Sequence, residues 1–277
     1  MVKRLVVNEG AHFTEDRPGS TRDVTVRKIQ GCRAIMHMAM HLKQRDGALD
    51  LLKWLALLSM VLDHLRYVGY SVDLLYIPGR LAFPWFCLAM AANLARARAV
   101  TTHGQWRYLG WLLLFSAISE IPYRMFIPDP GTLNVLPTLV LGLLVARGWQ
   151  DRTLQTRLLA AGALLLAALF PERLMFGFFG VLLPLAMLLV IGRPWYFALL
   201  PGLVCLAANQ WPVLYSAARF HNVEAILGIA ACLIAPLLGL LLLRQAKGFQ
   251  PPPMRRWAYA LYPLHFLLLL LVRNIAA

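Results

Sequence analysis

Long apolar runs dominate this sequence, and several approach the length that a helix needs to cross a lipid bilayer. Of the 277 residues, 60% are hydrophobic and only 14% are charged, whereas soluble domains carry about 25% charged residues. A crossing helix takes about 20 residues, and a backbone in lipid must satisfy its own hydrogen bonds. A transmembrane barrel would show alternating segments of about ten residues instead. The runs therefore predict an all-α, polytopic transmembrane helix bundle.

The chain divides into a polar start and a long apolar remainder. Residues 1–47 show mixed charge and no apolar period, which predicts a poorly ordered cytoplasmic tail. Residues 48–277 form the predicted transmembrane domain. About nine spans are expected, at residues 51–68, 80–99, 107–125, 133–148, 154–170, 175–191, 195–209, 223–243 and 257–275. Lys and Arg are much more frequent in the tail and in the loops on its side of the membrane, which places the amino terminus in the cytoplasm.

The basic charge and the cysteines exclude several functional classes. The net charge of +14 comes from basic residues that lie singly or in small groups between apolar runs, as in membrane loops, so nucleic acid is not an expected partner. The four cysteines form no C-x-x-C pair, and three lie in apolar runs. They are interpreted as small buried hydrophobic residues, and no metal site is predicted.

Ionisable residues at membrane depth are costly, so each one is a functional hypothesis. With a cytoplasmic amino terminus, five polar residues from the ends of the first four spans fall toward the outer side: Asp63, His64, Arg80, Glu120 and Asn134. We call these five the outer group. Their convergence predicts a catalytic site, in which His64 is the natural general base because imidazole titrates near neutral pH.

Structural interpretations of the outer group stay open beside the catalytic one. His64 and Asp63 can form a polar cap at a helix end, and Arg80 can extend its guanidinium to the headgroups, pair with Asp63 or Glu120, or hold an anionic group. Glu120 can make hydrogen bonds between helices or orient His64.

A second set of polar residues, the inner group, is expected at the cytoplasmic side. Asn93 and Arg96 end the second span, and Tyr259, Tyr262 and His265 lie in the inner half of the last one. Basic and aromatic side chains of this kind can hold phosphates and an adenine. Cytoplasmic Arg and interfacial Tyr also follow from topology alone. His265 is harder to explain in that way, because it lies inside an apolar run.

Three blocks of sequence resemble the TraX family, membrane proteins of conjugative plasmids that are associated with amino-terminal acetylation of pilin. The first is Leu58-Ser59-Met60-Val61-Leu62-Asp63-His64. The second begins with Gly79-Arg80-Leu81-Ala82-Phe83-Pro84-Trp85-Phe86 and ends with Asn93-Leu94-Ala95-Arg96. The third is Tyr259-Ala260-Leu261-Tyr262-Pro263-Leu264-His265. The similarity covers about residues 50–275, and the tail does not match.

The resemblance implies a multi-pass acetyltransferase of the bacterial inner membrane, with more distant similarity to polytopic acyltransferases. Acetyl would pass from cytosolic acetyl-CoA to the amino terminus of a pilin subunit during conjugation. His64 would take the proton of the attacking amine, Asp63 or Glu120 would fix its tautomer, and Arg80 would stabilise the oxyanion. Asn93, Arg96, Tyr262 and His265 would bind acetyl-CoA.

Two other functions fit the same residues. A proton-coupled transporter would use the buried charges as a relay, although the sequence shows no inverted pair of broken spans. The other possible function is that of a non-catalytic membrane subunit of pilin assembly. No glycine-rich phosphate loop, H-E-x-x-H or G-x-S-x-G motif is present, which argues against an ATP-driven pump, a zinc protease and a serine hydrolase.

Overall fold

The computed structural model describes residues 46–69, 73–97, 102–254 and 256–276, and its regular structure over these ranges is entirely helical. The all-α prediction is therefore confirmed for the described part of the chain. The predicted tail lies outside the described residues except for its last two, of which Gly47 already begins a helix.

Ten α-helices are numbered α2 to α11 over the described ranges. Their bounds are α2 Gly47–Leu65, α3 Tyr76–Ala97, α4 Thr102–Phe126, α5 Val135–Asp151, α6 Leu154–Leu169, α7 Gly177–Val190, α8 Leu199–Ala208, α9 Trp211–Arg219, α10 Val223–Gln245 and α11 Leu261–Ala276. Short 3₁₀ segments lie at Asp73–Leu75, Pro171–Arg173, Trp195–Ala198, Ala246–Gly248 and Arg256–Ala260. Every predicted span contains a helix whose ends lie within a few residues of the prediction. The short helix α9 was not predicted.

Within the described part of the chain, two helical segments are long and apolar enough to cross a membrane by length and composition: Val223–Gln245 and Trp257–Ile275. A third arises if α8 and α9, which meet at an angle of 87°, form one broken span. α6 and α7 are apolar but shorter, and α2 holds three charged residues: Asp50, Lys53 and Asp63. These apolar helices indicate a membrane protein. Nine crossings and a cytoplasmic amino terminus stay predictions.

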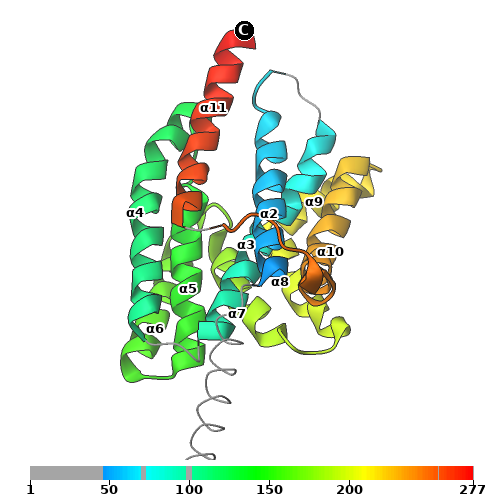
Figure 1. Cartoon of the computed structure of the whole chain (residues 1–277). Helices are drawn as coiled ribbons and strands as arrows, with labels where there is room; N and C mark the ends of the chain where they lie inside the picture. Colours follow the sequence, from blue (N-terminus) through cyan, green and yellow to red (C-terminus); the bar gives the residue numbers. More distant parts are fainter. Residues whose placement is uncertain (1–45, 70–72, 98–101, 255, 277) are drawn as a thin grey trace, which may run out of the picture. The chain divides into compact units, whose positions relative to one another are not determined.

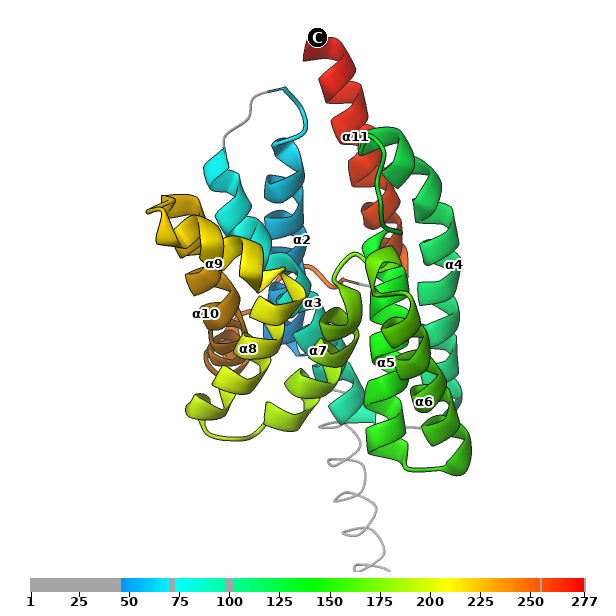
Figure 2. The same cartoon turned by 180° about the vertical axis from the view of Figure 1, so that it is seen from behind.

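α3 lies in the middle of the described helices, with α2, α7 and α10 packed around it (Figures 1 and 2). Its core-facing residues include Cys87, Leu88 and Ala91, none of which has any exposed surface. Small residues let helix backbones approach closely, and close packing is what holds helices together in lipid. Cys87, Cys205 and Cys232 are all buried and free, which confirms their interpretation as small core residues.

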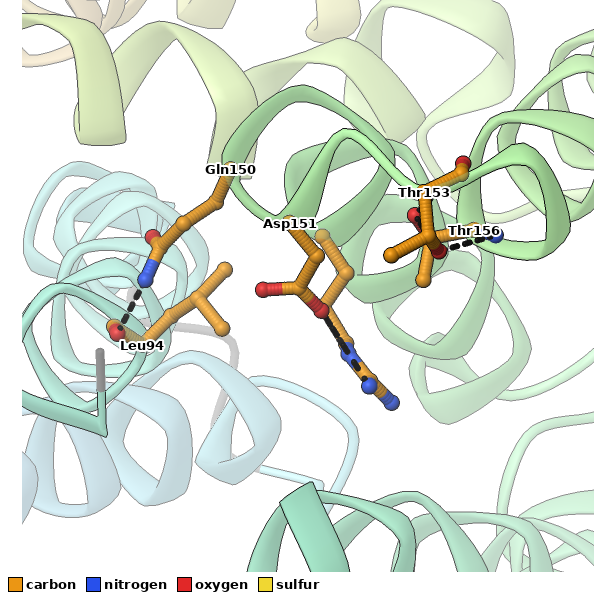
Figure 3. A network of polar contacts seen from close by, with 6 residues as sticks. Leu94, Gln150, Asp151, Thr153 and Thr156 are labelled. Atoms are coloured by element: carbon orange, nitrogen blue, oxygen red, sulfur yellow. Dashed lines mark hydrogen bonds and ion pairs between the residues drawn. The ribbon is translucent and has the colours of Figure 1, made fainter. Parts of the chain in front are cut away.

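One cation near the end of the span predicted at residues 133–148 lies inside the protein. The side chain of Arg147 is only 2% exposed, lies 3.3 Å from the Asp151 carboxylate and stacks over Trp106 at 4.3 Å. One turn of α5 away, the Gln150 amide donates a hydrogen bond of 2.8 Å to the Leu94 carbonyl at the end of α3 (Figure 3). These contacts fasten the ends of α3, α4 and α5 to one another.

The segment between α10 and α11 returns along α2. The Trp54 indole donates a hydrogen bond of 2.9 Å to the Pro252 carbonyl, and a side chain at Gly47 would collide with the Phe249 carbonyl. Three consecutive prolines at 251–253 supply no backbone N–H donors and so bar a helix here. Consequently α11 begins beside the middle of α4 rather than beside its first turn (Figure 1).

Candidate active site

Two histidines from opposite ends of the sequence meet between α2 and α11. The Nδ1 atom of His64 lies 3.1 Å from the Nε2 atom of His265. His265 is 6% exposed, whereas His64 is partly exposed. The rings of Phe266 and Phe126 pack edge-on against the His64 ring, with centroids at 5.0 and 6.2 Å. The site is therefore a pair of imidazoles in an aromatic surrounding.

This contact corrects the division into an outer and an inner group. His265 and Tyr262 were expected at the cytoplasmic side, but His265 touches His64 of the outer group. The expectation assumed that the last span starts at a membrane surface. Because the proline segment brings the chain back along α2, the first turn of α11 starts deeper in the bundle.

Asp63 and Arg80 form one of the ion pairs that the sequence allowed. The Asp63 carboxylate lies 3.0 Å from the Arg66 guanidinium and 3.7 Å from that of Arg80. The pairing prediction for Asp63 and Arg80 is therefore confirmed. Neither Asp63 oxygen makes a hydrogen bond to His64 within the described residues, so Asp63 does not orient that ring.

Arg80 also reaches the break between α8 and α9. Its Nη1 donates a hydrogen bond of 2.6 Å to the Asn209 side-chain oxygen, and its guanidinium lies 4.2 Å from the centroid of the Tyr76 ring. The next residue, Gln210, has φ of 54°, and this left-handed backbone separates the two helices. The Nε atom of Arg80 is buried and has no partner among the described residues.

The absence of a side chain at Gly79 permits the approach of Asp63 to α3. A methyl group there would lie 2.4 Å from an Asp63 carboxylate oxygen. We expect Gly79→Ala to lower the free energy of unfolding by about 1–3 kcal/mol, since the carboxylate must shift away from Arg80. Gly162→Ala on α6 is the matched control, because nothing lies within 4 Å of its new methyl group. Thermal unfolding of both variants in detergent tests this, and equal unfolding temperatures would contradict it.

Glu120 binds its neighbours on α4 and α5 instead of His64. One carboxylate oxygen accepts from Arg124 at 2.7 Å, and the other accepts from the Asn134 side-chain amide at 2.7 Å and from its backbone N–H at 3.1 Å. Asn134 is fully buried and caps the first turn of α5. The interpretation of Glu120 as a hydrogen-bonding link between helices is confirmed, and its expected contact with His64 is wrong.

Tyr262 connects this link to the histidines. Its hydroxyl accepts a hydrogen bond of 3.2 Å from the backbone N–H of Val135, the first residue of α5. Its ring lies 5.5 Å from that of His265, centroid to centroid. A continuous series of contacts therefore runs from Glu120 through Asn134 and Tyr262 to the histidine pair.

A cavity of about 390 Å³ lies beside the pair, between α2, α3, α4, α5 and the start of α11. Its lining is mainly apolar, with a few polar side chains: Lys53, Asn93, Tyr108, Tyr259 and Tyr262. Both the size and the lining are those of a small-molecule site. Met60, one turn before His64, also lines it, so the cavity approaches the histidine pair.

The predicted donor-binding residues separate into two kinds around this cavity. Asn93 and Tyr262 line it, whereas Arg96 and His265 do not. Arg96 is largely exposed and forms an ion pair with Asp46. The cation in the lining is Lys53, which lies 3.3 Å from the Asp50 carboxylate. Sequence reasoning left Lys53 without a role, although a charge inside an apolar run was a signal that could have found it.

The apolar helices and the enclosed polar residues define a helical membrane protein with paired histidines beside a cavity. The family model described as TraX protein matches residues 48–273. The chain therefore belongs to the TraX family, which confirms the resemblance of the three sequence blocks. No curated protein and no solved structure matches the chain.

Proposed function

We propose that the protein is a multi-pass acetyltransferase of the bacterial inner membrane that transfers acetyl from cytosolic acetyl-CoA to the amino terminus of a pilin subunit. The observation that carries the proposal is the histidine pair beside a ligand-sized cavity. Membership of the TraX family supports the pilin amine as acceptor and conjugation as the process.

The cavity suits the arm of a thioester donor. Lys53 and Met60 both line it and are seven residues apart on α2, so it extends about 10 Å along that helix. Asn93 offers an amide to the polar groups of such an arm. Lys53, which is paired with Asp50 in this structure, is the cation of the lining that a phosphate would meet. In this proposal the donor enters past Lys53 and Asn93, and its thioester lies at the Met60 end, near His64.

His64 supplies the base. A protonated amine is not nucleophilic, so transfer requires a group that takes a proton as the amine attacks the acetyl carbon. A positioned base of this kind contributes about 10²–10⁴-fold to the rate. His64 is partly exposed, and in this proposal the acceptor amine reaches its Nε2 atom. Arg80 stays the proposed oxyanion donor, because its Nε has no partner among the described residues, although Arg80 does not line the cavity.

The test is transfer by the purified full chain in lipid vesicles, with labelled acetyl-CoA and the mature pilin of the same plasmid. We expect label on the pilin amino terminus, located by fragmentation of the labelled peptide. Vesicles without protein give the background. Label found on lipid alone would show that lipid, and not the pilin amino terminus, is the acceptor. The absence of label on pilin, lipid or protein would contradict an acetyltransferase.

A proton-coupled transporter is the second candidate, and the broken span formed by α8 and α9 favours it. Transporters often bind their substrates at discontinuous helices, and here Arg80 bonds to Asn209 at the break. Substrate flux across the same vesicles without acetyl-CoA would support transport. Stable pilin binding with neither flux nor acetylation would support a non-catalytic subunit of pilin assembly.

A further inference from the structure

His265 lies where it can control the chemistry of His64. Its Nε2 atom is 3.1 Å from Nδ1 of His64, and this contact joins the two rings directly. The Nδ1 atom of His265 is buried, and no described side chain bonds to it. The rings of Tyr262 and Phe266, from the first turns of α11, pack against the His265 ring with centroids at 5.5 and 3.9 Å.

Two neutral imidazoles joined by one hydrogen bond can be arranged in two ways. If His265 donates, His64 carries its proton on Nε2, and this atom cannot accept another. If His64 donates from Nδ1, its Nε2 has a free electron pair and can act as a base. The orientation of this one hydrogen bond therefore decides whether His64 is competent for the proposed reaction.

We propose that His265 is a positioning residue that accepts the Nδ1 proton of His64 and so keeps the Nε2 atom of His64 free to act as the base. The inference rests on the proposed acetyl transfer. It gives His265 the task that the sequence assigned to Asp63 or Glu120, whose carboxylates are bound to other residues. A carboxylate orients the catalytic histidine in serine proteases by accepting the same proton.

The proton balance of the reaction is complete without a further group. The amine nitrogen bonds to the acetyl carbon, and its proton passes to Nε2 of His64. The carbon–sulfur bond then breaks, and the same proton passes to the departing thiolate of CoA. Because no described side chain bonds to Nδ1 of His265, the series of side-chain hydrogen bonds ends there. His265 therefore holds the ring and its tautomer and does not carry the proton away.

Substitutions of His265 separate hydrogen bonding from packing. His265→Phe keeps an aromatic ring but cannot accept a hydrogen bond, whereas the side-chain amide of His265→Gln can place its oxygen near the Nε2 position. We expect His265→Phe to lower kcat by about 10²-fold or more and to leave KM for acetyl-CoA nearly unchanged. His265→Gln should stay within about tenfold of the unchanged protein in kcat. Monodisperse elution and thermal unfolding establish that both variants fold.

If the kcat of His265→Phe equals or exceeds that of His265→Gln, His265 has a packing role and the inference is overturned. A second measurement does not depend on transfer. In ¹⁵N-histidine protein, NMR shifts distinguish the two neutral tautomers, and the His64 signals are those absent from His64→Ala. We expect His64 to be protonated on Nδ1 in the unchanged protein and in His265→Gln. In His265→Phe we do not expect this tautomer. Nε2-protonated His64 would overturn the inference. An Nδ1-protonated His64 without acetyl transfer would instead contradict the proposed function.

Discussion

Replacement of His64 by Ala is expected to lower the rate of acetyl transfer by about 10²–10⁴-fold, to near the vesicle background. The change removes the base and leaves the donor cavity intact, because His64 does not line it. Binding of acetyl-CoA should therefore persist while turnover is lost. The measurement is initial rate against donor concentration, together with CoA binding by equilibrium dialysis.

Two comparisons make the His64 result specific. His221 is an exposed histidine with φ of 60°, and His221→Asn changes a histidine without touching the cavity. Asn tolerates this left-handed backbone, so the control should fold and transfer normally. Added imidazole should restore part of the activity of His64→Ala, since a free base can enter the space of the lost ring. Transfer by His64→Ala at the rate of the unchanged protein would exclude His64 as the base.

The apolar runs were enough to predict the helices, because a segment in lipid has few alternatives to an α-helix. Each predicted span coincides with a helix, and the pairing of Asp63 with Arg80 across the first loop was one of the alternatives that the sequence offered. Contacts of this kind are accessible from sequence since the two residues come from consecutive helices. α9 escaped prediction because it lies between two predicted spans, in a segment that holds Gln210 and Arg219 and has no apolar run of span length.

The histidine contact was beyond sequence reasoning for a physical reason. His64 and His265 are 201 residues apart, and their meeting depends on how deeply α11 begins in the bundle. That depth is set by the proline segment, which packs on α2 through the Pro252 carbonyl and the bare backbone of Gly47. A pattern of hydrophobicity records which residues avoid water. It does not record where a connecting segment re-enters the protein.

Closing the cavity from α3 is the other change from which we expect a large effect. Ala89 lines the cavity and is 4% exposed, so a larger side chain at this position projects into space that the proposed donor needs. We expect Ala89→Leu to raise KM for acetyl-CoA and Ala89→Phe to remove measurable CoA binding. The order follows from side-chain size, whereas a folding defect would appear as a lower unfolding temperature. Ala161→Phe, on the exposed face of α6 and away from the cavity, is the matched control.

The cavity variants also test the position of the donor against the alternative functions. An acyltransferase whose donor arm lies between Lys53 and Met60 must lose donor affinity when Ala89 is enlarged, while His64 and His265 keep their contact on α2 and α11. Unchanged CoA binding and transfer in folded Ala89→Phe would place the donor elsewhere. If only pilin binding or substrate flux changed, the cavity would belong to a subunit or a transporter. If Ala89→Phe loses CoA binding while the tautomer of His64 is unchanged, the donor binds in the cavity and does not depend on the histidine pair for its affinity.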